Sequence, residues 1–490
     1  LVQYSLPPPP ASNSHFLERE REREIERMGP SKKGGGERTI SQEAFDELVK
    51  ENMEDLGMDP TEALDDAIQT LSLQGVHLSG IVKRVPGDAT AMDDPVVQCV
   101  EALKSLSGSD GAGEIFRKLL DSLNLAPTEA PAIAVRNGAI EIVCSACSGL
   151  ALPGPEEALA SGLNVLALLL YDLQCTEMFR SCGGHEMVVN VLDEGSRSES
   201  TCESVLDGGF AVVAAAATGN EVVKELFMEL KIDELILRVL KQDGAVKVKS
   251  VYEAIRVLLT PDDNRVVASQ VYGYARRFAK IGVAEVLVES MKNELTPASL
   301  ISASIALKAV AVNDEICKSI AQSGGIDVIL CSIDVSGEQG SSSVARTCCS
   351  LLSKLAGSDA NKSAIIEKGG LNRLIQLSAR FSDEPSVVAE VMSIITVICL
   401  RAPDNAVLAI EAGAGDLALQ AMEKFPSVQQ LQKSSCLMIR NLVVRNPENR
   451  TLLLNHGAEK LIRKAKETHG QCREAATDAL RDLGLDDYNR

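Results

Sequence analysis

The sequence predicts an all-α solenoid, a fold that grows by stacking similar helical units. At 490 residues the chain is too long for one ordinary globular core. Hydrophobic residues make up 45% of it but aromatic residues only 3%, with no Trp, so aliphatic side chains must build the core, and these suit helix-on-helix packing. Glycine also recurs at a nearly constant interval before stretches with helical apolar spacing, which indicates a repeated unit.

The repeat begins at about residue 130. Its marker positions lie 46, 47, 51, 43, 45, 43 and 44 residues apart, with Lys231 standing where one glycine is missing: Gly138, Gly184, Lys231, Gly282, Gly325, Gly370, Gly413 and Gly457. These intervals fit the roughly 40 to 47 residues of armadillo and HEAT units, and do not fit the roughly 33 to 34 of ankyrin or tetratricopeptide repeats. We expect about eight repeats over 129–484, with each glycine allowing a tight turn before a helix.

Each unit also contains a second, longer apolar helix. The pattern predicts such helices over 344–356, 387–400, 431–444 and 472–483. Short links rich in Asn, Asp and Pro follow them. Pro403 and Pro447 fit these links, because the first turn of a helix does not need every backbone N–H.

The N-terminal region differs from the repeat. Residues 1–38 are a predicted disordered leader, and we expect translation to begin at Met28, which would leave 1–27 non-native. Residues 39–128 are predicted to form a helical segment that caps the solenoid, with capping boxes at Thr39/Gln42 and Asp59/Glu62, one helix ending before Gly75 and another over 95–106. Residues 485–490 are a tail.

The interval of 51 residues contains an extended connection, 261–278. Aromatic and Arg side chains concentrate there in a chain poor in aromatics, a composition typical of interface anchors: Tyr272, Tyr274, Arg277 and Phe278. The alternative is that these residues lengthen and pack one helix.

Composition excludes several classes of ligand. A net charge of −20 and a pI near 4.9 would repel phosphate backbones, so we expect no nucleic acid partner. No apolar run is long enough to span a bilayer, so we expect no membrane association. The thirteen Cys lack the spacing of a disulfide framework and no secretory signal is present, which favours a reducing compartment. We expect a cytoplasmic monomer that is not secreted, with nuclear entry left open.

No arrangement typical of catalysis or of a metal site occurs. Cys144 and Cys147 form a C-x-x-C without a second pair, on an apolar helical stretch, and are better explained as buried thiols. The five His are scattered, and the glycine pairs lack the features of a phosphate loop. We expect no cofactor, no metal and no enzymatic activity.

Two stretches carry a resemblance to known proteins. Ile439-Arg-Asn-Leu442, followed by Asn446-Pro-Glu-Asn-Arg450, resembles the armadillo family. Phe45-Asp46 and Gln74-Gly75-Val76 look like the start of the armadillo repeat-containing protein 6 family, and the similarity covers the chain from about residue 40 onward. The resemblance implies a right-handed armadillo superhelix of the armadillo/HEAT type and protein binding, with no catalytic residues.

In proteins with the armadillo repeat, the longer helices line a groove. Import receptors hold an extended peptide in that groove with a row of Asn side chains, one from each of several repeats, called a ladder. Here only Asn441 occupies the ladder position, and Trp pockets are missing, so an import-receptor role loses support. Basic side chains instead fall on or near the predicted groove: Lys308, Lys354, Arg401, Arg440 and Arg445. These could select an acidic partner segment. Alternatively, they only keep the surface soluble.

The predicted function is therefore a non-catalytic scaffold or adaptor that binds partner proteins along the solenoid. The alternative is a client-carrying transport or chaperone factor, or a non-catalytic subunit of an enzyme complex. Dependence of client release on a nucleotide or a partner enzyme would separate the two.

Overall fold

The computed structural model describes most of the chain after the leader. The described residues are 38–78, 81–83, 85, 94–106, 111–150, 156–198, 202–242, 248–262, 269–293 and 295–485. The predicted leader, apart from Arg38, and almost all of the tail lie outside them. By its packing the chain divides into one unit of Leu1–Gln98 with Ser122–Asn137, and another of Cys99–Asp121 with Gly138–Arg490. The predicted boundaries at 39–128 and 129–484 stay predictions.

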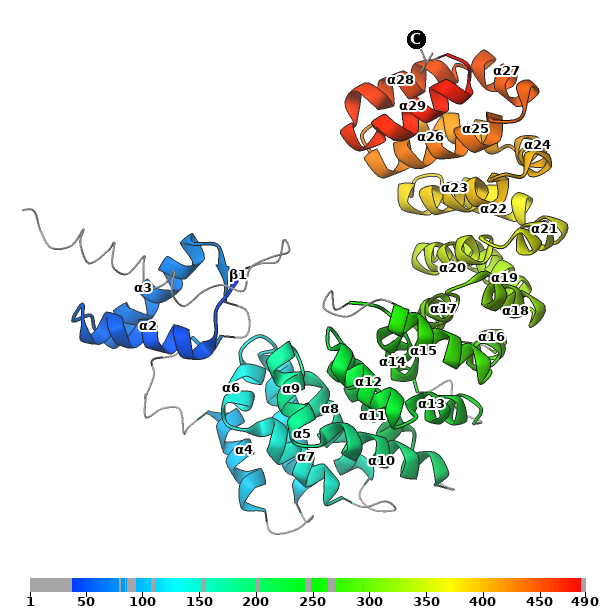
Figure 1. The fold of residues 1–490 in the computed structure, drawn as a ribbon. Coiled ribbons are helices and arrows are strands. Elements are labelled where there is room, and N and C mark those ends of the chain that lie inside the picture. Colours follow the sequence, from blue (N-terminus) through cyan, green and yellow to red (C-terminus); the bar gives the residue numbers. More distant parts are fainter. Residues whose placement is uncertain are drawn as a thin grey trace, which may run out of the picture. The chain divides into compact units, whose positions relative to one another are not determined.

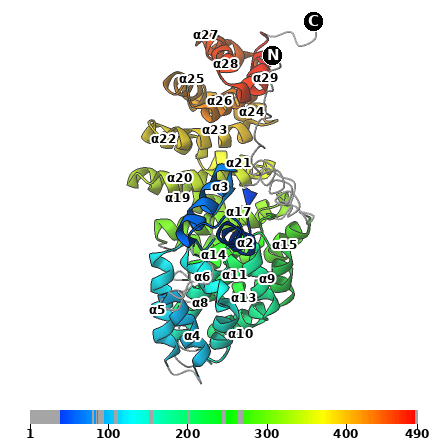
Figure 2. The same cartoon turned by 90° about the vertical axis from the view of Figure 1, so that its left-hand side faces the viewer.

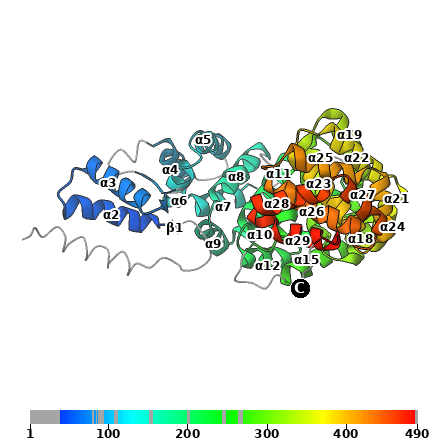
Figure 3. The ribbon, with the colours of Figure 1, turned by 90° about the horizontal axis from the view of Figure 1, so that it is seen from above.

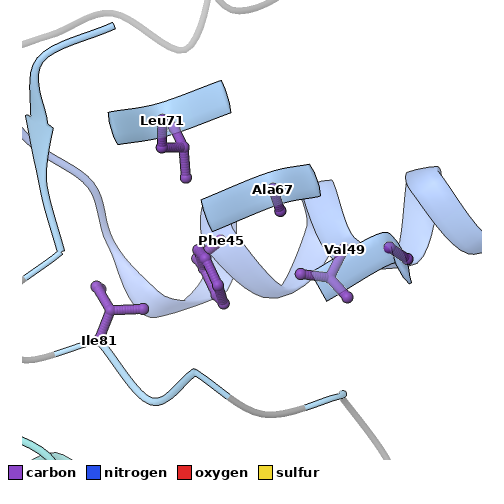
Figure 4. Packing of buried hydrophobic residues seen from close by; sticks show 6 residues of the cluster. Phe45, Val49, Ala67, Leu71 and Ile81 are labelled. Carbon is purple, nitrogen blue, oxygen red and sulfur yellow. The ribbon is translucent and has the colours of Figure 1, made fainter. Parts of the chain in front are cut away.

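The first unit is built around two helices, α2 (Gln42–Glu54) and α3 (Pro60–Leu73). Their apolar residues recur at intervals of four, so each helix buries one face against the other. Figure 4 shows this cluster, whose fully or nearly fully buried members are Phe45, Val49, Ala63, Ala67, Leu71 and Ile81. Two short strands, β1 (Arg38–Thr39) and β2 (Val76–His77), pair in parallel beside the helices.

One of the two predicted helix caps in this unit is confirmed and the other is wrong. Asp59 caps α3 by accepting hydrogen bonds from the N–H groups of Thr61 and Glu62. The N-cap of α2 is Ser41, not Thr39, because Thr39 is held in β1. The Gln42 side chain does not reach back toward the cap. Its amide exchanges two hydrogen bonds with the backbone of Val82, at 2.7 and 3.2 Å.

The all-helical repeat is confirmed. After α4 (Pro95–Ser105) and α5 (Ala112–Leu125), the described helices group into eight triplets. The first helices are α6 (Ala130–Arg136), α9 (Leu173–Ser181), α12 (Glu221–Glu229), α15 (Ser269–Lys280), α18 (Asp314–Gln322), α21 (Asp359–Glu367), α24 (Pro403–Glu411) and α27 (Pro447–Asn455). The second helices are α7 (Ala139–Ser148), α10 (Gly184–Arg197), α13 (Ile232–Leu240), α16 (Val283–Lys292), α19 (Gly325–Gln339), α22 (Gly370–Arg380), α25 (Ala414–Lys424) and α28 (Ala458–Thr468).

The third helices are the longer apolar helices of the sequence pattern, and the four predicted ones lie within about two residues of their predicted bounds. They are α8 (Glu156–Leu169), α11 (Glu203–Ala217), α14 (Ser250–Leu258), α17 (Pro297–Val310), α20 (Ser342–Leu355), α23 (Pro385–Cys399), α26 (Gln429–Val443) and α29 (Arg473–Asp482), the last preceded by a 3₁₀ turn, Gly470–Cys472.

Within the second unit, helices of the same kind stack on one another. Each third helix from α8 to α29 packs on the third helix of the next triplet, and the second helices form a parallel stack of their own. Figures 1 and 2 show α20, α23 and α26 in successive layers, and Figure 3 shows α22 and α25 together near one edge. The continuous apolar core therefore runs between neighbouring triplets, as expected of a solenoid.

The turns between first and second helices correct one detail of the sequence prediction. The left-handed residue that precedes the second helix has φ between 61° and 101° in all eight triplets: Gly138, Gly183, Lys231, Gly282, Gly324, Gly369, Gly413 and Gly457. Where two glycines are adjacent, the first takes this conformation and the second begins the helix. Gly184 is needed for another reason, because a Cβ there would lie 2.3 Å from the Phe179 ring.

Candidate protein-interaction surface

The third helices reverse the charge of the chain over part of the solenoid. The four helices α17, α20, α23 and α26 together carry five Lys or Arg and only one acidic residue, Glu390. The chain as a whole has 69 acidic and 49 basic residues. Because these four helices stack side by side, their basic side chains belong to one continuous helical layer. A local excess of positive charge in a strongly acidic protein is a feature that selects acidic partners.

The ends of these helices carry exposed cations. Lys354 lies in the last turn of α20, and Arg401 and Arg445 follow α23 and α26 directly. All three side chains are exposed, and none has an ion-pair partner among the residues that the structure describes. Positive charge near a helix C-terminus is also favourable to the helix itself, by a few tenths to about 1 kcal/mol, so part of the role of these residues is local.

Two further predicted cations are engaged by neighbouring helices. Lys308 Nζ donates a hydrogen bond to Ser350 Oγ at 2.6 Å, which joins α17 to α20. Arg440 lies 3.3 Å from Asp478 and 3.5 Å from Asp482, both on α29. The two carboxylates therefore partly neutralise the charge of Arg440, whereas the hydrogen bond of Lys308 is to a neutral hydroxyl and leaves its charge in place.

Asn441 lies in the same layer but faces the neighbouring helix. It is buried, and its side-chain amide donates to the backbone carbonyl of Thr396 on α23 at 2.8 Å. One donor of the amide thus links two adjacent triplets.

The residues of the insertion lie on α15, a first helix, and the structure gives them different environments. Tyr272 is 46% exposed, whereas Phe278 is completely buried. The Tyr274 hydroxyl accepts a hydrogen bond from Gln270 at 2.8 Å. No hydrogen bond or ion pair joins any of them to the basic set within the described residues.

Arg277 is held by the preceding triplet. Its guanidinium contacts both carboxylate oxygens of the completely buried Asp233, with Nε 2.6 Å from Oδ2 and Nη2 donating to Oδ1 at 2.7 Å. Its Nη1 also donates to the Met228 carbonyl at 3.1 Å. Burial raises the pKa of the Asp233 carboxyl, and the Arg277 charge opposes that shift. This ion pair, with its one hydrogen bond to Asp233 and one to Met228, fixes α15 against α12 and α13.

Sequence reasoning missed two basic residues of the same layer. Arg346 on α20 is exposed and Lys433 on α26 is half-buried, and neither has an ion-pair partner in the described part of the chain. A signal for them exists: each stands two residues after the first buried aliphatic residue of its helix, Val344 or Leu431. An alignment of the repeats on that position would have found them.

Two lysines that are not on this layer are buried. Lys224 is completely buried, and its Nζ reaches Glu221 at 2.8 Å, Asp262 at 2.5 Å and the Thr260 carbonyl at 2.7 Å. In the same place of a later triplet, Lys362 reaches Asp359 at 2.7 Å and the Leu400 carbonyl at 2.9 Å. Both lysines join the start of a first helix to the segment that follows the third helix of the same triplet.

No group of three or more His, Cys, Asp or Glu among the described residues could hold a metal ion. Cys144 and Cys147 are both buried, and burial raises the pKa of Cys147 to about 12. No described helix is by itself long and apolar enough to cross a membrane, although two bent helix pairs reach that length and composition together.

Two known protein-family models match the chain, one near its N-terminus and one in its C-terminal half. Residues 37–101 match the Armadillo repeat-containing protein 6 N-terminal domain, and residues 303–485 match the LRRK2 ARM repeat. Armadillo repeat-containing protein 6 of Pongo abelii is 29% identical over 386 residues, and that of Homo sapiens is 28% identical, each alignment covering 75% of both chains. This chain is similar to the armadillo repeat-containing protein 6 family.

A third similar protein comes from Drosophila melanogaster. The Armadillo repeat-containing protein 6 homolog of Drosophila melanogaster is 24% identical, with 77% of this chain and 80% of the homolog covered. Among solved structures, an engineered protein superposes with a TM-score of 0.66 at 18% identity, over 91% of this chain and 99% of the engineered one. The engineered protein supports the armadillo fold alone.

Proposed function

We propose that this armadillo protein is a non-catalytic scaffold or adaptor that binds an acidic segment of a partner protein along its third helices α17 to α26. The single observation that carries the proposal is the charge of these helices, five bases against one acid in a chain of net charge −20. The coarser role, protein binding through an armadillo repeat, is the one that the family supports.

The exposed cations give the layer its binding potential. Lys354, Arg401 and Arg445 come from three successive triplets, so an extended acidic segment could meet one cation in each. Each exposed pair contributes little alone, roughly 0 to 1 kcal/mol, because water and salt screen it. Several pairs along one segment contribute together, and they also accelerate the encounter of oppositely charged surfaces.

Affinity capture tests the proposal directly. The full chain and a triple variant, Lys354→Glu with Arg401→Glu and Arg445→Glu, would be used to capture proteins from the same extract, with identification by mass spectrometry. We expect the triple variant to lose partners that contain acidic segments. A matched control is Arg256→Glu, which reverses a cation on the third helix α14 that is already paired with Glu253 at 2.5 Å. If the triple variant captures the same set as wild type, the basic layer is not the binding surface.

A further inference from the structure

Two neighbouring triplets repeat the same exposed pair, an apolar side chain followed by Arg. Leu400 directly follows α23 and is 46% exposed, and the exposed Arg401 comes next. Val444 directly follows α26 and is 43% exposed, and the exposed Arg445 comes next. After α20, in the preceding triplet, the same two places hold a buried Ala and a Gly. The pairs are therefore a feature of two adjacent triplets and not of the repeat as such.

Asn side chains hold the two pairs at equivalent places. The Asn446 amide, directly after the second pair, donates to the Pro403 carbonyl, just beyond the first pair, at 3.1 Å. Asn405 and Asn449 occupy the same place in their triplets, and each donates to a carbonyl in the last turn of its own third helix, at 3.0 and 2.9 Å. Because α23 and α26 also pack on each other, the two turns present their pairs side by side.

Each pair is followed by a further exposed leucine on the next first helix. Leu408 on α24 is 42% exposed and Leu452 on α27 is 38% exposed, each eight residues after Leu400 or Val444. A single exposed apolar side chain is ordinary on a protein surface. Here such side chains recur at equivalent places of helices that pack on one another, α23 with α24 and α26 with α27. Together they form an apolar surface that a partner can cover.

The backbone of one pair is strained. Among the described residues, only Arg401 and Lys231 combine a side chain with a positive φ, which is 61° in both. The same place after α11 holds Gly219, with φ of 68°, and glycine adopts this conformation freely. A side chain there is unfavourable, and Arg401 has no ion pair among the described residues that would offset the cost. Strain of this kind points to a use for the side chain outside the fold itself.

The charge of the two arginines is available to a partner. The next acids along the chain, Asp404 and Glu448, stand in the first turns of α24 and α27, where the free N–H groups favour negative charge. Neither forms an ion pair with the arginines in the part of the chain that the structure describes. Asp359, which also feels the charge at the first pair, is already paired with Lys362 at 2.7 Å.

We propose that the acidic segment bound by the third helices carries apolar side chains beside its acids, and that it lies as an extended chain across the two pairs. Its apolar side chains cover Leu400 and Val444, and its carboxylates meet Arg401 and Arg445. This inference rests on the proposed function and adds the chemistry of the partner. Exposed ion pairs alone are weak and screened by salt, whereas burial of apolar surface is not screened, so the apolar half of each pair supplies binding that salt does not remove.

The stacking of the helices sets the spacing in the partner. Packed helices lie roughly 8–10 Å apart, and three residues of an extended chain span about 10 Å. An apolar residue next to an acid should therefore recur at every third residue of the partner segment.

Three twelve-residue peptides test this chemistry by fluorescence anisotropy with the full chain. The first repeats Leu-Glu-Ser, the second repeats Ser-Glu-Ser and keeps only the charge, and the third repeats Leu-Gln-Ser and keeps only the apolar side chains. We expect the first peptide to bind about tenfold more tightly than either of the others. Raised salt should weaken the second peptide more than the first. Equal affinity for the first and second peptides would overturn the inference.

Variants locate the apolar contact. Leu400→Ser with Val444→Ser should weaken the first peptide about tenfold and leave the second unchanged. The matched control is Leu173→Ser with Val222→Ser, which removes a Leu and a Val that are 43% and 48% exposed at the starts of α9 and α12, and should bind as wild type. Both double variants should keep the melting temperature of wild type, because the side chains are exposed.

A single variant separates binding from stability at the strained residue. Arg401→Gly should weaken the first peptide about threefold while the melting temperature stays the same or rises, because glycine relieves the left-handed backbone. A structural role alone would lower the melting temperature and leave binding unchanged, and that result would overturn the use assigned to Arg401.

The outcomes distinguish this inference from the proposed function. If Leu400→Ser with Val444→Ser binds the first peptide as wild type does, while the triple charge variant of Lys354, Arg401 and Arg445 still loses the second peptide, only the apolar contact is wrong. If the triple variant binds all three peptides as wild type does, the proposed function fails as well. Analytical ultracentrifugation of the chain alone tests the other occupant. A dimer that Leu400→Ser with Val444→Ser converts to a monomer would show that a second copy covers this surface, and would also overturn the inference.

Discussion

The third helices of the first three triplets and of the next four differ in charge. In the first three triplets, α8, α11 and α14 carry five acidic residues and one basic residue, Arg256. In the next four triplets the ratio is reversed, with five bases and one acid. The helices have the same place in the repeat and the same apolar stacking face, so the difference lies only in the side chains that the stack does not need.

Two cations near the boundary between these regions are used inside the structure. Lys224 of the third triplet is buried between two carboxylates, and Arg277 of the fourth is paired with the buried Asp233. Lys354, Arg401 and Arg445 of the later triplets have no such partner among the described residues. The scaffold thus uses some cations to join its helices, including Lys362 of the later triplets, and presents others on the surface. Evidence for binding should therefore be sought at the exposed cations, and effects on stability at the buried ones.

The largest effect that separates the two regions is expected at the buried lysines. Lys224→Met leaves the Glu221 carboxylate, 4% exposed, without a cation, and should destabilise the protein by about 3 to 5 kcal/mol. Lys362→Met leaves the Asp359 carboxylate without its lysine partner, but this carboxylate is 93% exposed and can be hydrated. We therefore expect the free energy of unfolding to fall by only about 1 kcal/mol. Denaturant unfolding would measure both.

A double variant checks the cause of that difference. Lys224→Met combined with Glu221→Gln removes the stranded charge, and should regain at least half of the lost stability. Equal losses for the two single variants would show that burial of the partner carboxylate does not set the energy.

The fourth triplet, where the two regions meet, gives the next contrast. Phe278→Ala empties a completely buried site on α15 and should cost about 3 to 5 kcal/mol. Tyr272→Ala, on the same helix but 46% exposed, should change stability by no more than about 0.5 kcal/mol. Thermal unfolding of the two variants decides which insertion residues are structural. A loss of partners on Tyr272→Ala without a loss of stability would assign Tyr272 to an interface.

The charge difference itself predicts a smaller, salt-dependent effect. Binding of a twelve-residue Asp/Glu-rich probe peptide should weaken about tenfold, or about 1.4 kcal/mol, in the triple variant of Lys354, Arg401 and Arg445 to Glu. Added salt should weaken binding to wild type more than binding to the variant, because screening acts on exposed charges. Fluorescence anisotropy at several salt concentrations would measure this. Arg256→Glu should leave the affinity unchanged, and an equal loss in that control would indicate a general effect of net charge.

The repeat could be predicted from sequence because its signals are local. Apolar spacing and recurring glycines depend on residues within one helix or turn, and they gave the all-helical solenoid and the bounds of the longer helices to within about two residues. Which of two adjacent glycines takes the left-handed conformation could not be predicted. Gly183 and Gly184 look alike in the sequence, but in the structure Gly183 has φ of 76° and Gly184 lies against the Phe179 ring.

The surface was harder to predict because its partners come from other triplets. The Asn441 amide is bound by Thr396, and Arg277 by Asp233, each about one repeat away. The sequence shows that such residues are polar or aromatic, but it does not show whether a neighbouring triplet forms a hydrogen bond or ion pair with them. The Ser41 cap was missed for a similar reason, since Thr39 is held in a strand pairing with residues far along the chain.

The smallest expected effect concerns the one turn in which an early triplet departs from the glycine of the later ones. Lys231 has φ of 61° where Gly413 has 101°, and a side chain in this left-handed region costs about 1 kcal/mol. Lys231→Gly should therefore raise stability, by about 0.5 kcal/mol once the greater freedom of glycine in the unfolded chain is subtracted. Lys231→Ala keeps the strain and loses the exposed contact with Glu234, 3.4 Å away, so it should give no gain. Gly413→Ala should lower stability by about 1 kcal/mol. Unfolding midpoints of the three variants would test this, and a gain from Lys231→Ala equal to that from Lys231→Gly would show that the backbone at this turn is not strained.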